Sequence, residues 1–233
     1  MKVVVAVSTA IVGYVFFLLT TVAGSRQRNI PENDFIRKGR ISAVLWMRAS
    51  GFLFFGVLPF FAVIVIFHYR ISSLGISLSG IENSLYWGLG LSVIIIPVSF
   101  MNAKNPKLQK KYPQMRTKTW TVGLLVISAT SWIFYLLAYE FLLRGFLFFS
   151  SLEAAGLGVA LIINVVVYTV FHIHKGKKEM AGAVIFGCGL CLVTFATKSI
   201  WAAWLIHVAL ALSSEWAFIH HHPLMEIRGF SPR

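Results

Sequence analysis

The sequence predicts an all-α, polytopic membrane protein, folded as a bundle of about seven transmembrane helices. Three observations lead to this prediction. Of the 233 residues, 58% are hydrophobic and only 12% are charged, and the mean hydropathy is +0.78. Seven apolar runs are long enough to cross a bilayer, which takes about 17–25 residues. The basic residues concentrate in alternate connectors between these runs, as in polytopic membrane proteins.

This composition excludes several classes of protein. Disordered chains, fibrous chains and disulfide-rich secreted scaffolds have other compositions, and there are only 2 cysteines. The low share of charged residues also argues against a soluble enzyme. A net charge of +13 would suggest nucleic acid in a soluble protein. No basic strip interleaved with aromatic residues is present, so no nucleic-acid partner is predicted.

The first predicted span is 3–23. It resembles a signal peptide because Lys2 precedes it and small residues follow it, but its apolar core of about twenty residues exceeds the usual 7–15. We therefore interpret it as a retained span. The spans that follow are 44–68, 85–101, 121–149, 157–173, 181–197 and 200–219. Ser150–Gly158 is the expected turn between the fourth and fifth spans. Around these spans we expect N-terminal helices and basic connectors over 1–119, a membrane core over 120–219 and a polar tail over 220–233.

The distribution of basic residues predicts the orientation of the bundle. Only Lys2, Arg70 and Lys198 lie on one predicted side, and Arg144 lies within a span. The other Lys and Arg residues lie on the opposite side, on or beside the connectors 25–40, 102–119 and 174–180 or in the tail. Because positive loops remain in the cytoplasm, this predicts an N-outside, C-inside arrangement. Anionic lipid headgroups are the expected partners of this basic face.

Four polar residues within the spans are candidate functional residues: Glu140, Arg144, His172 and His207. A charged residue near the bilayer centre costs about 2.5–3.5 kcal/mol, so such residues usually face a bundle interior or a water-filled cavity. Glu140 and Arg144 are four residues apart and share one helix face. They are either an internal ion pair that fixes helix packing or a carboxylate that Arg144 keeps ionised to act on water. Asn164 and Glu215 are weaker candidates.

The histidines and cysteines do not indicate a metal site. His172 and His174 are two residues apart and do not share a helix face, so no metal and no other cofactor is predicted. His207 lies in the middle of its span, where its ring nitrogens need polar partners. Cys188 and Cys191 lie among glycines, and we interpret them as small residues that permit close helix packing.

Three segments together resemble the CPBP family (CAAX protease and bacteriocin-processing), which are intramembrane glutamic endopeptidases. The family motifs are Glu-Glu-x-x-x-Arg, Phe-x-x-x-His and His-x-x-x-Asn or Asp, on consecutive membrane helices. The corresponding segments here are Tyr139-Glu140 with Arg144, Tyr168 with His172, and His207 with Ala211. The resemblance covers about 120–212. Tyr139 replaces the first glutamate, Tyr168 the phenylalanine, and Ala211 the Asn or Asp.

The resemblance implies metal-independent hydrolysis of a peptide bond in a membrane-associated peptide or protein, within a prokaryotic cytoplasmic membrane. It implies catalytic roles for Glu140, His172 and His207, with Arg144, Tyr139 and Tyr168 supporting them. In one hypothesis Glu140 is the general base with His172 sharing the proton, and His207 stabilises the oxyanion, with the Tyr139 hydroxyl as a further donor.

Two alternatives remain open. Because two polar positions of the family motifs are lost, the site could be a catalytic relic, and the protein would then regulate or protect another membrane protein by binding it. A third hypothesis is a transporter that uses Glu140 as a proton site. Against this hypothesis, the chain lacks the internal repeat of many transporters.

Overall fold

A computed structural model describes residues 2–25, 41–173 and 176–228, so most of the predicted basic connector 25–40 lies outside the described residues. The longer helices are α1 (Lys2–Ser25), α3 (Ile41–Phe52), α5 (Ile81–Ala103), α7 (Val122–Glu140), α8 (Phe149–Val170), α9 (Lys177–Thr197) and α10 (Trp201–His221). The short helices are α4 (Leu58–Phe61) and α6 (Pro106–Gln109), with a 3₁₀ turn at Ile71–Leu74. Three π-helical segments, Leu53–Val57, Ala62–Ile66 and Phe141–Phe148, continue neighbouring helices.

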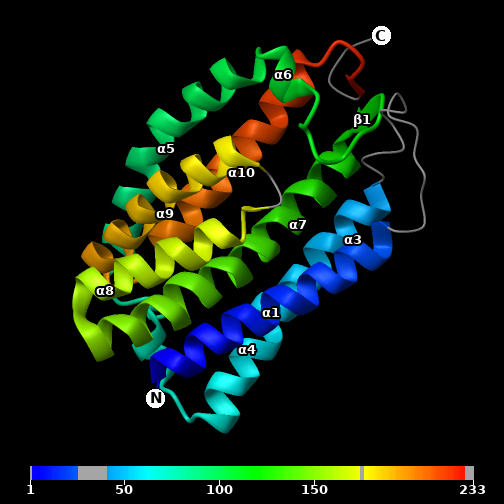
Figure 1. Cartoon of the computed structure of the whole chain (residues 1–233). Coiled ribbons are helices and arrows are strands. Elements are labelled where there is room, and N and C mark those ends of the chain that lie inside the picture. Colours follow the sequence, from blue (N-terminus) through cyan, green and yellow to red (C-terminus); the bar gives the residue numbers. More distant parts are fainter. Residues whose placement is uncertain (1, 26–40, 174–175, 229–233) are drawn as a thin grey trace.

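The predicted number of spans agrees with the fold. Among the described residues, six helical runs are long and apolar enough to cross a membrane. One of them, Val122–Val170, has 49 residues, which as a straight helix would measure roughly twice the thickness of a bilayer core. Gly156 interrupts it with φ 78° and ψ 176°, values that an L-residue with a side chain rarely adopts. The chain turns back here, so that α8 packs against Phe141–Phe148, the π-helical segment that continues α7 (Figure 1). The run therefore contains the fourth and fifth spans.

The bundle is arranged around α7 and α8, with α1, α3 and α4 on one side and α9, α10 and α5 on the other (Figure 1). Helix α1 is part of the bundle, since Ala6, Ala10, Tyr14 and Phe17 are buried in the main core cluster. This packing agrees with a retained first span. Helix α5 packs on α10, where the hydroxyl of Ser213 donates to that of Ser99 at 3.0 Å.

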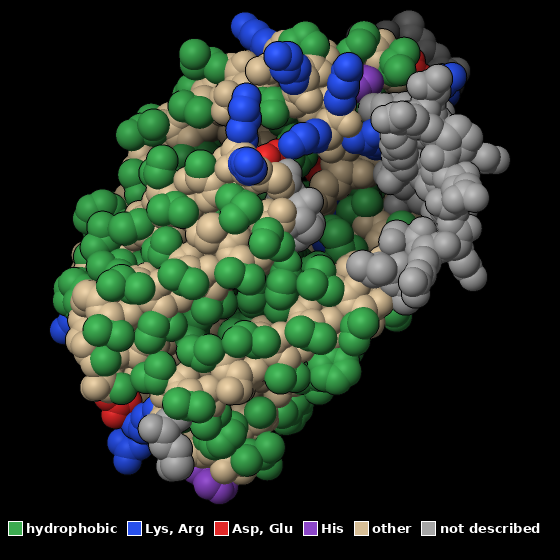
Figure 2. Space-filling model, in the orientation of Figure 1, with side chains coloured by type: hydrophobic (Ala, Val, Ile, Leu, Met, Phe, Trp, Pro, Cys, Tyr) green, Lys and Arg blue, Asp and Glu red, His purple; other side chains and the backbone are tan. Residues whose placement is uncertain are grey.

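The outer surface has the character of a membrane protein. Figure 2 shows hydrophobic side chains over most of the visible face, with Lys and Arg side chains gathered at the end that carries α6 and β1. This segregation of charge matches the distribution from which the topology was predicted. Which end faces the cytoplasm remains a prediction.

A pair of short parallel strands was not predicted. β1 (Thr119–Thr121) pairs with β2 (Glu226–Arg228), with Thr119 opposite Glu226. Trp120 in β1 is fully buried. Residues His220 and His221, placed in the predicted polar tail, continue α10. The tail therefore returns to the N-terminal end of α7. There it adds a small two-stranded β element to the otherwise all-α bundle, at the end of the bundle where the Lys and Arg side chains gather.

Close packing between α8 and α9 gives a first testable prediction. A Cβ atom on Gly187 would lie 2.8 Å from the ring of Tyr168, whereas a Cβ on Gly189 would meet nothing within 4 Å. Gly187→Ala should therefore destabilise the fold by about 1–3 kcal/mol through overpacking. Thermal unfolding in detergent, with Gly189→Ala as the matched control, measures this. Equal stability of the two variants would contradict the packing.

Candidate active site

A cavity of about 420 Å³ opens between the helices of the core. Its walls come from α7, α8, α9 and α10, and also from α1, α3 and the connector between α5 and α7. Aromatic side chains make up much of the lining. The side chains on its wall that carry a polar group are Tyr14, Asn102, Tyr112, Gln114, Trp132, Tyr135, Tyr139, Tyr168, His172, Glu179, His207, Ser214 and Glu215. The three helices that carry the motif segments, α7, α8 and α10, thus all contribute to the wall of this cavity.

Behind this wall, Glu140 and Arg144 form the predicted ion pair. Helix α7 ends at Glu140 and continues as the π-helical segment Phe141–Phe148. Both side chains are fully buried, and Arg144 Nη1 lies 3.2 Å from Glu140 Oε2. The Arg144 guanidinium also lies over the Tyr168 ring, 4.4 Å from its centre. The amide of Asn164 donates to the Leu143 carbonyl at 2.5 Å and so ties α8 to the π-helical segment.

His207 connects this ion pair to the cavity. Its Nδ1 lies 2.5 Å from Glu140 Oε1, although 67 positions separate the two residues in the sequence. Since Arg144 favours the ionised carboxylate, which can only accept, Nδ1 carries the proton and Nε2 is left with a lone pair in the neutral ring. His207 lines the cavity, whereas Glu140 does not. The carboxylate therefore reaches the cavity through the histidine.

His172 and the two tyrosines complete the wall near His207. The Nδ1 of His172 is 2.9 Å from the Tyr168 carbonyl oxygen. The Tyr168 ring lies near both histidines, with its centre 4.7 Å from that of His172 and 6.4 Å from that of His207. The Tyr139 ring lies 5.8 Å from His207. The six residues to which the family resemblance gives roles thus gather at one place, with Glu140 and Arg144 behind and the other four on the wall.

The replaced motif positions also lie at this cavity. Ala211 lines it one turn after His207 and offers no side-chain donor. Tyr139 brings a phenol to the position where the family has a carboxylate. Among the described residues, no group of three or more His, Cys, Asp or Glu side chains is arranged to hold a metal ion.

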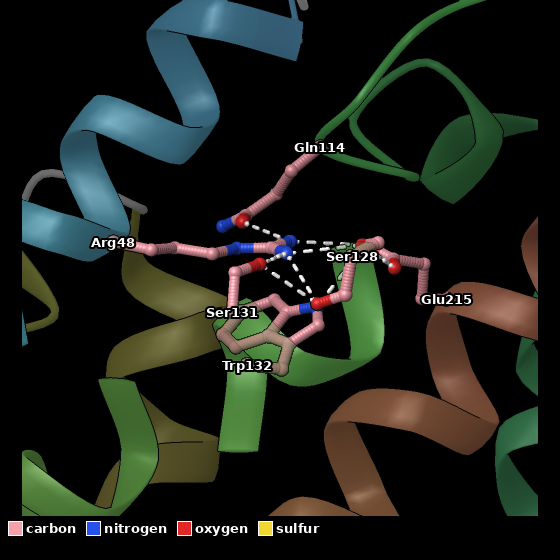
Figure 3. A network of polar contacts seen from close by, with 6 residues as sticks. All are labelled: Arg48, Gln114, Ser128, Ser131, Trp132 and Glu215. Carbon is pink, nitrogen blue, oxygen red and sulfur yellow. Dashed lines mark hydrogen bonds and ion pairs between the residues drawn. The ribbon is translucent and has the colours of Figure 1, made fainter. Parts of the chain in front are cut away.

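Figure 3 shows a second polar network, of which Gln114, Trp132 and Glu215 line the same cavity. Arg48 from α3 forms a buried ion pair with Glu215 from α10, at 3.0 Å, and its guanidinium lies 4.0 Å from the centre of the Trp132 ring. Its Nη1 donates to Ser128 and Ser131 of α7. Its Nη2 donates to Gln114. The hydroxyl of Ser128 and the indole N–H of Trp132 donate to the Glu215 carboxylate.

The sequence predicted this network only in part. Glu215 was a weak candidate, and Arg48 was expected on the basic membrane face. Arg48 is instead 1% exposed and bound in the interior. Its position within an apolar span was the available signal, because a buried cation requires a partner. Nothing in the spacing indicates a carboxylate 167 positions away.

The connector between α5 and α7 borders the cavity. Tyr112 stacks on Phe218 of α10 with ring centres 5.4 Å apart, and Lys111 pairs with Glu179 of α9 at 2.7 Å. Burial, together with the nearby Glu179 charge, raises the pKa of the Tyr112 hydroxyl. This tyrosine therefore stays neutral at the cavity rim.

These features define a polytopic membrane protein with a Glu–His pair on an internal cavity. A family model described as type II CAAX prenyl endopeptidase Rce1-like matches residues 116–213, which include all three motif segments. Members of that family are intramembrane proteases. This match supports the assignment of these residues to the CPBP family, which the motif resemblance implied. Neither a curated protein nor a solved structure was found to match the chain.

Proposed function

We propose that the protein is a membrane-embedded endopeptidase in which His207, held by Glu140, activates water for attack on a peptide bond. The contact between His207 Nδ1 and the Glu140 carboxylate, at the edge of a cavity, is the observation that carries the proposal. A carboxylate on one ring nitrogen fixes the tautomer and stabilises the imidazolium that forms when the other nitrogen accepts a proton. Glu140 is then a positioning residue, and Arg144 keeps it ionised.

The reaction is hydrolysis in two steps. His207 Nε2 accepts a proton from water, and the water oxygen bonds to the carbonyl carbon, whose oxygen takes up the displaced electron pair. The C–N bond then breaks as the imidazolium returns the proton to the leaving nitrogen. His172 faces the same cavity and helps to hold the water. The Tyr139 hydroxyl donates to the oxyanion, a role for which a phenol is suited.

Hydrolysis of prenylated peptides tests this proposal, because the matching family model names prenyl endopeptidases. Prenyl-cysteine peptides with a fluorophore and a quencher on either side of the bond after the cysteine are added to the purified chain in lipid nanodiscs. His207→Ala should lower the rate by about 10²–10⁴-fold through loss of the general base. His221→Ala, on the same helix and bonded to the Ala217 carbonyl, is the matched control and should keep the wild-type rate.

The second candidate function is a catalytically degenerate member that binds and regulates or protects another membrane protein. Ala211 favours it, since loss of one oxyanion donor typically costs 10²–10³ in rate. Under this alternative the wild type and His207→Ala would be equally inactive on every peptide. A membrane partner would then co-purify equally with both variants.

A further inference from the structure

Some side chains of the Arg48–Glu215 network face the cavity, and the others lie on the side away from it. Gln114, Trp132 and Glu215 line the cavity, whereas Arg48, Ser128 and Ser131 stand behind them. Arg48 is 1% exposed, and its guanidinium balances the Glu215 charge from the side away from the cavity. The cavity wall at this end is therefore polar and carries little net charge.

Gln114 and Glu215 together offer the cavity a donor and an acceptor. Both accept a hydrogen bond from the same nitrogen, Arg48 Nη2, at 3.2 and 3.0 Å, so their oxygens are neighbours. A guanidinium can only donate, which assigns the Gln114 atom in this contact as the carbonyl oxygen. Its NH₂ group is then the one left for another partner. A carboxylate beside an amide NH₂ complements a peptide group, which has one N–H and one C=O.

The separation from His207 fits an extended polypeptide. The residues of α10 that line the cavity form one continuous stripe: His207, Leu210, Ala211, Ser214, Glu215 and Phe218. Glu215 follows His207 by eight residues, which is about 12 Å along the helix. An extended chain advances about 3.3 Å per residue. Three or four residues would therefore span the distance from the reacting bond to Glu215.

The geometry points to a substrate subsite at Gln114 and Glu215 that binds a peptide group three or four residues from the bond at His207. This inference rests on the proposed function and adds a substrate requirement to it: an extended peptide that reaches from His207 to Gln114 and Glu215. A peptide group in a largely aromatic cavity needs hydrogen-bond partners, and these two side chains supply them. A free carboxylate at this place would find no free counter-charge, because Arg48 is already paired with Glu215.

Binding of peptides of graded length tests the subsite. The probes are fluorescently labelled prenyl-cysteine peptides with an amidated C-terminus. One series is lengthened by one to four residues on the N-terminal side of the bond that follows the cysteine, and a second series on its C-terminal side. Binding is measured by fluorescence anisotropy. The protein is the full chain carrying His207→Ala, in which the bond stays intact. Affinity should rise by about 3- to 10-fold when the peptide reaches three or four residues on one side, as expected for one or two new hydrogen bonds.

Variants within the network identify the groups responsible. Gln114→Leu should remove the length-dependent gain, and Gln114→Glu should also remove it, because it keeps an oxygen for Arg48 but loses the NH₂ donor. Ser131→Ala is the matched control, since it also loses a bond to Arg48 but does not line the cavity. It should retain the gain. Thermal unfolding establishes that each variant is folded.

The outcomes separate the subsite from the proposed function. Three results would overturn the subsite, even where the wild type hydrolyses the peptides. They are an affinity that does not depend on peptide length, no binding of any peptide, and a length-dependent gain in affinity that survives in both Gln114 variants. A gain that only the Gln114 variants abolish supports the subsite, even where the wild type hydrolyses nothing and the proposed function falls.

Discussion

The paired variant Glu140→Gln/Arg144→Gln should fold but hydrolyse peptides about 10³- to 10⁴-fold more slowly than the wild type. Both residues are fully buried, so replacing Glu140 alone would leave a buried cation without its counter-charge and endanger folding. Changing both residues keeps the site neutral and leaves no buried charge without a counter-charge. An amide can bond to either tautomer of His207, so the tautomer with a free Nε2 is no longer enforced.

Single-turnover rates of the purified chain in nanodiscs measure this effect, with thermal unfolding as the measure of integrity. The matched control is Lys2→Gln/Glu153→Gln, which removes the same two charges from an exposed ion pair of 2.7 Å. This control should keep the wild-type rate. If the Glu140–Arg144 variant also kept it, the pair would be purely structural and His207 would not depend on the carboxylate.

Arg48→Met alone should lower the free energy of unfolding by about 3–5 kcal/mol, because it leaves Glu215 buried without its counter-charge. Arg48 and Glu215 are 1% and 3% exposed at their side chains, and they join α3 to α10. The double variant Arg48→Met/Glu215→Leu also removes the Glu215 charge that the single variant leaves buried. The double variant should recover much of the stability, since an apolar pair can replace a buried ion pair at little cost.

Equilibrium unfolding in mixed detergent micelles gives the coupling energy of this pair from the wild type, the two single variants and the double variant. Trp132→Phe serves as a separate comparison, because it removes the indole N–H that donates to Glu215 but retains an aromatic ring beside Arg48. A double variant as unstable as the sum of the two single variants would show that the charges do not interact. The ion pair would then not hold α3 against α10.

The structure matches the sequence-based predictions more closely for the fold than for the site. Span positions followed from length and hydropathy, and even the turn between the fourth and fifth spans was expected close to Gly156. The Glu140–Arg144 pair was predictable because both residues lie one turn apart on a single helix. The β1–β2 pair was missed, since each strand has only three residues and its partner is more than a hundred positions distant.

The site departs from the sequence interpretation in the position of one group. The spacing and the family motif suggested that Glu140 would act directly on water. In the structure its carboxylate is covered by His207 and does not line the cavity. Hydropathy and spacing show that a polar residue is buried, but they do not show which of its neighbours stands between it and the substrate.

The sequence by itself determined the class of protein, the number of membrane spans, the resemblance to the CPBP family over about 120–212 and the residues that gather at the cavity. These properties depend on composition, helical period and local motifs, all of which are read within one span or from one span to the next. Only the tertiary structure decided the partners: Glu140 with His207, and Arg48 with Gln114 and Glu215. Such contacts depend on how separate helices pack. An apolar helix surface can pack against many others, and the need of buried polar groups for hydrogen-bond partners selects among these arrangements.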